Sequence, residues 1–359
     1  MKKSTVVILF GGRSVEHAVS VNSARNIYQF MDRNRFEPVA IGITTDGRWF
    51  LLPEVTKEIE SGEPVSLKLD AREPAFVSAS GKVIRPDVVF PIVHGTDGED
   101  GGIQGILKVV DVPCVGSGVT GSAVCINKHL AKKLMAAAGL PIPAYLAATP
   151  VTRDAFTFEV VKKALGLPFM VKSASLGSSV GVTKVKTEAD FDPALDDAFR
   201  YDTEVIFEQY VQGREVECAV LGNGSPETST PGEIVISKQY EFYTFDAKYV
   251  DPDAVRIQIP AEISATTAEQ VRELAARAFE VLYCLDYARV DMFVTSGGSI
   301  YINEINTIPG FTNSSMYPMM WKQHGVSFTD LISRLIHIAH ARHAEGQRQQ
   351  RSYQSNLRY

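Results

Sequence analysis

Long hydrophobic runs are absent from the sequence. No apolar run approaches the roughly 20 residues that a membrane-spanning helix needs. The first apolar run, at residues 6–10, is also too short for the core of a secretory signal. These absences argue against a membrane protein and against a secreted one, and residues 6–10 are better explained as a first buried strand.

Cysteine is scarce as well. The four cysteines, Cys114, Cys125, Cys218 and Cys284, are scattered, and none belongs to a C-x-x-C pair. This pattern excludes a disulfide framework and a typical zinc site, and it fits reduced thiols that pack as small apolar side chains. We therefore expect a cytoplasmic protein.

Positive charge is not in excess. The formal net charge is −6 at pH 7, which argues against a nucleic-acid partner and against an anionic membrane surface, although a local basic pocket for phosphates stays compatible with it. The composition, 45% hydrophobic and 22% charged, is that of an ordinary globular protein. A chain of 359 residues exceeds what one hydrophobic core organises, so we expect two or three domains.

The N-terminal third alternates predicted strands and helices. Apolar runs predict strands at residues 6–10, 38–43 and 87–93, and helices at residues 19–30 and 103–109. This alternation is typical of a parallel sheet that is covered by helices. Ligands of such sheets gather at the carboxyl ends of the strands, so polar residues at those positions are candidate site residues.

Two polar groups fall at such strand ends. Glu16 follows the first strand, and His94 opens the glycine-rich loop after a later one. A lone histidine is commonly a structural group, but Glu99 and Asp100 on the same loop favour a site. Glu16 could equally be an acid at a helix N-terminus, where the helix dipole stabilises it.

Residues 116–121, Gly-Ser-Gly-Val-Thr-Gly, match the G-x-G-x-x-G pattern of dinucleotide-binding folds. That pattern also needs a preceding strand and an acidic residue about 20 positions later, which holds the ribose. Here no Asp or Glu occurs between Gly121 and Asp154. We interpret the pattern as a turn before a helix at residues 122–138, so a nicotinamide cofactor is disfavoured.

A strand, a loop of small residues and a second strand are predicted at residues 167–185. The loop Ser-Leu-Gly-Ser-Ser-Val-Gly offers backbone N–H groups and hydroxyls to phosphate oxygens, and Lys172 adds charge at the end of the first strand. It is not a Walker A loop, because its lysine precedes the glycines and strands flank it. The alternative is a flexible hairpin without a ligand.

Two further segments point to the same ligand class. Residues 204–222 predict two short strands joined by a hinge whose backbone could bind an adenine edge, with Glu215 on the ribose; an exposed acidic strand pair explains them equally well. Residues 237–258 are polar and aromatic and lack a clear periodicity, which is typical of a lid loop.

The most informative stretch is residues 289–310. It contains two strand-like runs joined by Ser-Gly-Gly-Ser, which predicts a tight hairpin. A turn centred on the two glycines places Asp291 opposite Glu304 and Arg289 opposite Asn306. Because side chains alternate between the faces of a strand, these four residues share one face.

Two carboxylates directly across a strand pair repel each other, so a positive group should lie between them. Asp291, Glu304 and Asn306 supply hard oxygen ligands without Cys or His, which suits Mg²⁺. Mg²⁺ held by a few carboxylates usually completes its coordination with phosphates, so the hairpin predicts a nucleotide site. The alternative is a solvent-facing hairpin with chance acids.

Five motifs in a fixed order carry a resemblance to a known family. They are Gly-Gly-x-Ser-x-Glu16-His, His94-Gly-x-x-Gly-Glu-Asp-Gly, Gly177-Ser-Ser-Val-Gly, Lys248-Tyr249, and Asn303-Glu-Ile-Asn-Thr-Ile-Pro-Gly-Phe-Thr. In this order they resemble the D-alanine–D-alanine ligases of the ATP-grasp superfamily, from about residue 4 to residue 341.

The resemblance implies an α/β and α+β ATP-grasp fold with a Rossmann-like, parallel-sheet N-terminal domain. The implied units are an N-terminal substrate domain at residues 1–125, a central ATP-grasp lobe at 126–214 and a C-terminal lobe at 215–345 that contains the lid. Residues 346–359 are charged and Gln-rich and are expected to be a disordered tail. A homodimer is also expected.

The resemblance assigns the nucleotide and metal roles residue by residue. ATP phosphates would contact Lys128, Lys172 and Lys248, and adenosine would be held by Glu208, the backbone near Val211, and Glu215. Two Mg²⁺ ions, for which Mn²⁺ can substitute, would be coordinated by Asp291, Glu304 and Asn306. The metal set agrees with the set that the hairpin argument reaches independently.

The resemblance likewise assigns the binding of two D-alanine molecules and the formation of D-alanyl-D-alanine for peptidoglycan synthesis. Glu16, in contact with Ser178 and Tyr249, would bind the first ammonium group, with His94 beside it. Arg289 and the Gly310 N–H would form the oxyanion site. Ser315 and the Met316 N–H would bind the second carboxylate.

Three positions depart from the usual family pattern: Ser173 replaces a proline, Asn127 an aspartate and Ala18 a glutamate. None is an assigned ligand, although Ser173 could loosen the phosphate loop. Tyr249 favours the dipeptide over the D-alanyl-D-lactate ester. A catalytically silent nucleotide-binding protein on the same fold is the alternative, against which the complete set of Lys172, Arg289 and the three metal ligands argues.

Overall fold

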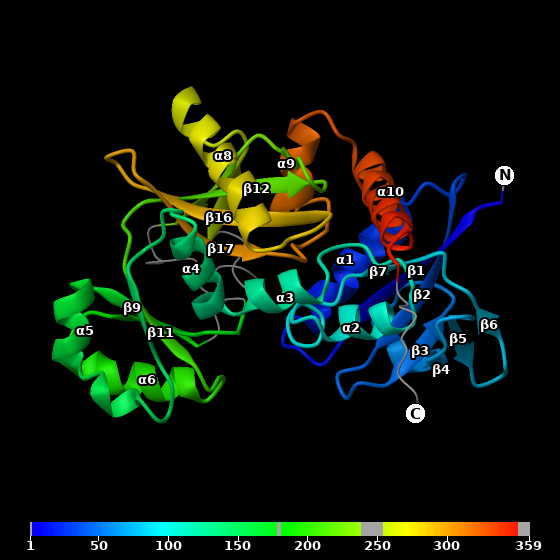
Figure 1. Ribbon diagram of the computed structural model, residues 1–359, viewed down its shortest axis with the longest axis horizontal. Coiled ribbons are helices and arrows are strands. Elements are labelled where there is room, and N and C mark those ends of the chain that lie inside the picture. The colour runs from blue at the N-terminus through cyan, green and yellow to red at the C-terminus, as the bar shows by residue number, and fades with distance from the viewer. Residues whose placement is uncertain (1, 178–180, 238–253, 351–359) are drawn as a thin grey trace, which may run out of the picture.

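Three β-sheets organise the chain (Figure 1). The structure is a computed structural model that describes residues 2–177, 181–237 and 254–350. None of the helices in these ranges is both long and apolar enough to cross a membrane.

The N-terminal sheet has seven strands in the order β6-β5-β4-β3-β2-β1-β7. Its strands are β1 (Ser4–Gly11), β2 (Phe36–Ile43), β3 (Trp49–Leu52), β4 (Glu63–Lys68), β5 (Ala75–Ser78), β6 (Val83–Ile84) and β7 (Val88–Pro91), with α1 (His17–Phe30) and α2 (Gly102–Val109) as its helices. The parallel sheet that the sequence predicts is present in part, because β1 pairs in parallel with β2 and β7.

The other half of this sheet is antiparallel, which the helix–strand alternation did not predict. Only a short turn separates β2 from β3, and Thr44 N donates to Arg48 O across it at 2.9 Å. A connection of that length can join only antiparallel neighbours, since a parallel crossover needs a dozen or more residues.

The central sheet has four antiparallel strands in the order β10-β9-β11-β8. Its elements are β8 (Tyr145–Ala148), α5 (Phe158–Leu165), β9 (Phe169–Ser173), β10 (Val182–Val185), α6 (Phe191–Phe199) and β11 (Val205–Gln209). Phe169 and Val171 pack into the core beneath α5 and α6. Alternation along β9 then directs Lys172 to the opposite face, which stays available for a ligand.

The C-terminal sheet runs β15-β14-β12-β16-β17, with β13 paired to β12. Its elements are β12 (Arg214–Leu221), β13 (Glu227–Thr228), β14 (Gly232–Ile236), β15 (Val255–Gln258), α8 (Ala265–Val281), β16 (Tyr287–Val294) and β17 (Ile300–Asn306). Val290, Ile302 and Ile305 are buried in one core with residues of α8. The opposite face carries the polar residues of the hairpin.

Two helices, α3 (Val119–Ile126) and α4 (Lys128–Ala137), connect the N-terminal sheet to the central one. The expected single helix at residues 122–138 is therefore broken. Asn127 has extended backbone angles, and its side-chain oxygen accepts from Leu130 N at 2.8 Å as the N-cap of α4. The break places Lys128 in the first turn of α4.

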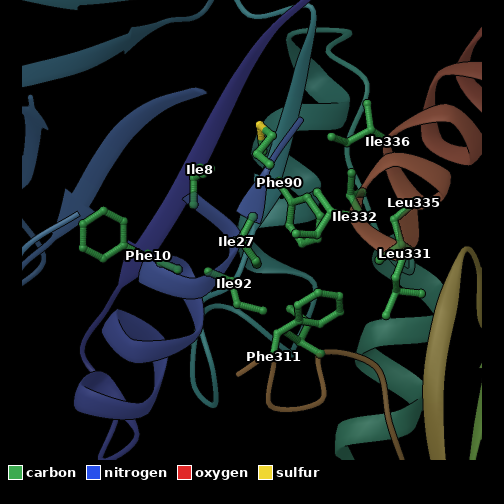
Figure 2. Close-up of a cluster of buried hydrophobic side chains, with 14 of the residues drawn as sticks. Ile8, Phe10, Ile27, Phe90, Ile92, Phe311, Leu331, Ile332, Leu335 and Ile336 are labelled. Carbon is green, nitrogen blue, oxygen red and sulfur yellow. The ribbon is translucent and has the colours of Figure 1, made fainter. Parts of the chain in front are cut away.

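The C-terminal helix α10 (Phe328–Gly346) follows α9 (Met316–Gln323) and returns to the N-terminal sheet, where it contacts α1 and β7. Figure 2 shows its Leu331 and Leu335 in one cluster with Phe90 of β7 and with Phe311, which lies on the loop after β17. Because Phe311 is fully buried there, the loop after β17 is held against the N-terminal sheet.

Replacing Phe311 with alanine is expected to lower the free energy of unfolding by about 3–5 kcal/mol, because the cavity cannot be refilled by its neighbours. Urea unfolding followed by tryptophan fluorescence measures this directly, since Trp321 is buried in the same cluster. Phe191→Ala in the central lobe is the matched control and should destabilise without altering the loop after β17. A loss below about 1 kcal/mol for Phe311→Ala would show that this loop is not anchored by packing.

Candidate active site

The β16–β17 hairpin has the predicted register at its base. Arg289 pairs with Asn306 and Asp291 with Glu304, and all four lie on the face opposite the α8 core. Near the tip the register is shifted by one, because the turn runs from Thr295 to Ser299.

A β-bulge between these two regions restores the predicted pairing. The extra residue of the bulge is Asn303, whose side-chain oxygen lies 3.4 Å from Lys172 Nζ of the central sheet. Asn303 was not among the predicted site residues, because a bulge leaves no mark in a simple alternation of residues.

Arg289 provides a positive charge beside the opposed carboxylates of the hairpin. Its Nε and Nη2 donate to the two carboxylate oxygens of Asp291, each at 2.7 Å. Its Nε also lies 3.0 Å from Glu217 Oε2. Glu217 pairs with Asp291 across β12 and β16 and is 4% exposed, so a third acid borders the hairpin. Glu217 was not a predicted site residue, although it lies only two residues beyond Glu215, the expected ribose ligand.

Two lysines approach these acids from the other side. Lys128, in the first turn of α4, has its Nζ 3.5 Å from Glu304 Oε2 and donates to Leu176 O at 2.6 Å. Lys172, near the end of β9, forms an ion pair with Glu208 of β11. The polar face of the C-terminal sheet therefore opposes a lysine-bearing face of the central sheet.

A cavity of about 160 Å³ lies between these two faces. Every described residue expected at ATP lines it: Lys128, Lys172, Glu208, Val211 and Glu215. The hairpin contributes Asp291, Asn303 and Glu304 to the same wall. The predicted nucleotide ligands, which span nearly ninety positions of the chain, thus meet at one place.

A second cavity, of about 410 Å³, lies where the N-terminal sheet meets the C-terminal lobe. Its lining includes the described residues expected at the amino acids: Glu16, His94, Arg289, Gly310, Ser315 and Met316. Glu16 Oε2 lies close to two glycines. A Cβ atom added at Gly95 would lie 2.9 Å from this oxygen, and one added at Gly177 would lie 3.4 Å from it. Its carboxylate is thus held at the junction of two glycine-containing loops.

His94 is buried and connects the N-terminal sheet to the loop after β17. Its Nδ1 lies 2.9 Å from Ile308 O and its Nε2 lies 3.0 Å from Ser23 Oγ. Because a carbonyl oxygen only accepts, this network assigns the proton to Nδ1. Phe311 N also donates to Ser23 Oγ at 3.2 Å. His94 therefore positions the loop that carries Gly310.

Glu99 lies beside His94, with Oε1 3.6 Å from His94 Nδ1. Burial raises the pKa of Glu99, and His94 partly opposes this shift. The carboxyl group is thus biased toward its neutral form at the base of the larger cavity.

The N-terminus of α9 closes the far end of the larger cavity. Ser315 is its N-cap, and Met316 is its first residue. Thr312 N donates to Ser315 Oγ at 3.0 Å, and a Cβ on Gly310 would come 3.1 Å from the same oxygen. A helix N-terminus with a hydroxyl beside it favours a carboxylate, and the close approach explains a glycine at position 310.

The two cavities share one wall. Five residues line both: Lys128, Gly177, Glu217, Arg289 and Glu304. A group bound in the smaller cavity can therefore contact a group bound in the larger one across Arg289 and the hairpin acids. This arrangement suits the transfer of a group between two ligands.

Comparison with known proteins decides the family. The family model described as D-ala D-ala ligase N-terminus matches residues 5–117, and the one described as D-ala D-ala ligase C-terminus matches residues 134–337. The chain belongs to the D-alanine–D-alanine ligase family.

Among the relatives of this family, the D-alanine–D-alanine ligase A of Chromobacterium violaceum is 47% identical over 352 residues, which cover 94% of this chain and 96% of the relative. The D-alanine–D-alanine ligase structure from Coxiella burnetii superposes with a TM-score of 0.86 at 38% identity, and 97% of each chain is covered. The structure of the VanG D-Ala:D-Ser ligase from Enterococcus faecalis also superposes with a TM-score of 0.86, at 34% identity, and the match covers 94% of this chain and 100% of that one.

Two of the departures from the family pattern have local explanations in the structure. Asn127 Nδ2 donates to Glu204 Oε2 at 3.1 Å while its oxygen caps α4. Ser173 Oγ donates to Ala198 O at 2.9 Å, which ties the end of β9 to α6. Ala18 is exposed on α1. The Ser173 contact argues against a loosened strand end at that position.

Three residues that the family resemblance singles out, Ser178, Lys248 and Tyr249, lie outside the described residues. Of the expected lid at residues 237–258, the structure describes Ser237 and the segment from residue 254 onward, which contains β15. Val255 and Ile257 line the larger cavity, so the described part of this segment borders the site.

The donor set of the hairpin fits a magnesium ion of the kind that family members are expected to use. Asp291, Glu304 and Asn306 offer only oxygen atoms to a hard cation, and Asn306 Oδ1 also accepts from Ile308 N at 3.0 Å. Within the described ranges no three or more His, Cys, Asp or Glu side chains form a metal-binding group. Two carboxylates and one amide would leave part of the coordination of such an ion to phosphate oxygens or water.

Proposed function

We propose that this protein joins two D-alanine molecules into D-alanyl-D-alanine, with conversion of ATP to ADP and phosphate, for the synthesis of peptidoglycan precursors. The observation that carries the proposal is the wall shared by the two cavities. It allows a phosphoryl group from a nucleotide in the smaller cavity to reach an amino acid in the larger one.

The first step activates a carboxylate, which is otherwise a poor electrophile. The carboxylate of the first D-alanine attacks the γ-phosphorus of ATP and forms an acyl phosphate while ADP leaves. Lys128 and Lys172 are placed to offset charge on the transferring phosphoryl group, and Glu208, Val211 and Glu215 line the part of the cavity that adenosine would occupy.

Asp291, Glu304 and Asn306 would hold two Mg²⁺ ions, or Mn²⁺ in their place. When bound, the ions stabilise negative charge on the phosphates during phosphoryl transfer. Arg289 can then release Asp291 and keep its contact with Glu217, so that its guanidinium group stays directed into the shared wall.

The second step forms the peptide bond. The amine of the second D-alanine attacks the acyl carbon, and the tetrahedral intermediate collapses with loss of phosphate. Arg289 and the Gly310 N–H would stabilise the oxyanion. Ser315 and the Met316 N–H at the start of α9 would bind the carboxylate of the second D-alanine, and Glu16 the ammonium group of the first.

Residues outside the described ranges complete the proposal. We expect Ser178 and Tyr249 to support Glu16, and Lys248 to contact phosphate when the lid closes over the site. Because a solved relative is a D-Ala:D-Ser ligase, product choice needs its own measurement. With D-alanine, D-lactate and D-serine offered together at neutral pH, Tyr249 predicts the D-alanine dipeptide, and a dominant ester would overturn this choice.

Replacing Glu16 with glutamine is expected to raise KM for the first D-alanine roughly 10- to 100-fold, because a charge-assisted hydrogen bond to an ammonium group is lost. KM for ATP should stay nearly constant. Initial rates measured over a range of D-alanine concentrations, and separately over a range of ATP concentrations, give the two constants. Glu37→Gln, on an exposed position of the same sheet, is the control, and an unchanged KM for D-alanine in Glu16→Gln would remove Glu16 from the site.

The test of the activity itself is phosphate release from ATP with each D-amino acid in turn, with products identified by mass spectrometry. We expect release to depend on D-alanine and to yield D-alanyl-D-alanine. Binding of ATP without D-alanine-stimulated release would instead support a silent nucleotide-binding protein, and an NADH-linked absorbance change would support an oxidoreductase.

We further propose the units 1–125, 126–214 and 215–345. Each contains one of the three sheets, which supports the division, while α10 packs back onto the first sheet. A cytoplasmic location agrees with the need for ATP, and the expected homodimer can be checked by analytical ultracentrifugation.

A further inference from the structure

Lys132 is a buried lysine to which the proposed reaction assigns no role. It lies on α4, one helical turn after Lys128, and only 1% of it is exposed. Its Nζ lies 2.5 Å from Glu208 Oε2. Lys128 lines both cavities, whereas Lys132 lines neither, so Lys132 lies behind the nucleotide cavity.

Glu208 is thereby shared between two lysines. Oε1 pairs with Lys172, which lines the nucleotide cavity, and Oε2 pairs with Lys132. Desolvation alone would raise the pKa of Glu208, but Lys132 and Lys172 together lower it, so the group stays a carboxylate. Burial lowers the pKa of Lys132, and the contact with Glu208 opposes that shift. With both lysines charged, two ammonium groups against one carboxylate leave one positive charge in excess, and Lys172 is the lysine that lines the cavity.

We propose that Lys132 is a positioning residue, the permanent counter-ion of Glu208, which leaves the charge of Lys172 available to the phosphates of the nucleotide. This inference rests on the proposed nucleotide roles of Lys172 and Glu208. Without Lys132, the buried carboxylate would have Lys172 as its only close cation among the residues that the structure describes. Lys172 would then be neutralised where it is expected to bind phosphate, because a buried carboxylate requires a partner.

The readout is the ratio of the Kd for adenosine to the Kd for ATP, which isolates the contribution of the phosphates. Calorimetric titration of the full-length protein with Mg²⁺ and without D-alanine gives both constants. Lys132→Met should lower this ratio on the order of 10- to 100-fold, within the range usual for energetic coupling between sites. Lys133→Met, which removes an exposed charge from the next position of α4, should leave the ratio unchanged.

A double-mutant comparison distinguishes this role from a purely structural one. Lys172→Met should lower the ratio by itself. Adding Lys132→Met together with Glu208→Gln, which leaves no unpaired buried carboxylate, should lower it no further, because the second lysine acts only through the first. A structural lysine would weaken adenosine and ATP equally, or would add its effect to that of Lys172→Met. Either result overturns the inference.

The paired variant Lys132→Met with Glu208→Gln covers the case in which Lys132→Met does not fold. It removes the carboxylate together with its counter-ion, so no unpaired buried charge remains, and Lys172 regains its excess charge. We expect the ratio to return toward the wild-type value even if adenosine itself binds more weakly. A ratio that stays as low as in Lys172→Met overturns the inference.

The two proposals fail in different ways. If Lys172→Met leaves the ratio unchanged, the phosphate role of Lys172 is wrong and the inference fails with it. If Lys172→Met lowers the ratio but Lys132→Met and the paired variant both bind as the wild type does, the nucleotide site stands and only the role of Lys132 is wrong.

Discussion

Replacing Arg289 with methionine is expected to lower kcat by roughly 10²- to 10³-fold, the usual loss when one oxyanion donor is removed. Arg289 lies in the wall that the two cavities share, and its guanidinium group is held between Asp291 and Glu217. Its contact with buried Glu217 is the one that persists when Asp291 binds the metal ions, and it keeps the guanidinium group directed at the reacting groups. We expect KM for ATP to change little, because the effect belongs to the transition state.

Steady-state kinetics of dipeptide formation measure this change. Arg289→Lys keeps the charge but loses the planar fork, so it should recover only part of the activity. Arg277→Met, at an exposed position of α8, controls for the loss of an arginine from the same lobe. A variant at position 289 that retained near-normal kcat would show that the oxyanion is stabilised elsewhere.

Replacing Glu304 with glutamine is expected to weaken Mn²⁺ binding at least 10- to 100-fold. Mutating a residue that only hydrogen-bonds to a metal ligand typically causes a loss of this size, and Glu304 is expected to be a ligand itself. The variant keeps the size of the side chain but lowers its charge, and Glu304 lies opposite Asp291 on the hairpin. Electron paramagnetic resonance of free Mn²⁺, titrated with protein and ADP, measures the affinity without any turnover.

The same variant should lower kcat by on the order of 10²-fold or more, since metal-ion stabilisation of phosphoryl transfer contributes several kcal/mol. Glu273→Gln, on the exposed face of α8, is the control for both measurements. Unchanged Mn²⁺ affinity in Glu304→Gln would remove the hairpin from the metal site, whatever happened to the rate.

The hairpin shows how far local patterning can predict a site. Period-two alternation and a Gly-Gly turn were enough to place Asp291 opposite Glu304, and the structure confirms the pairing. The turn is centred on Gly297 and not between the two glycines, however, so the pairing near the tip is shifted by one residue, and the bulge at Asn303 compensates for it. The predicted pairing at the base of the hairpin is correct only because the bulge offsets the shifted turn, and residue alternation does not predict a bulge.

Other features depend on packing between distant segments and could not be predicted from local patterns. Lys132 is indistinguishable from its neighbours on a Lys-rich helix until α4 lies against β11, which brings its Nζ to Glu208. Glu217 lies within an ordinary strand pattern until β12 pairs with β16. The antiparallel half of the N-terminal sheet follows from a short turn, which competes with the helix–strand alternation.

The roles of individual residues in the reaction came from the family resemblance and not from patterning. The residues themselves indicate that Glu16 and His94 follow strands, and that Ser315 belongs to a hydroxyl-rich segment after Gly310. Only the tertiary structure brings them to one cavity, in which His94 and Ser23 hold the loop that carries Gly310.

The most direct test of the account is an anomalous difference map from crystals grown with Mn²⁺ and a nonhydrolysable ATP analogue. The account predicts manganese peaks within about 2.5 Å of carboxylate oxygens of both Asp291 and Glu304, with the analogue phosphates beside Lys172. Manganese bound away from the hairpin, or phosphates bound outside the cavity between the central and C-terminal sheets, would contradict it.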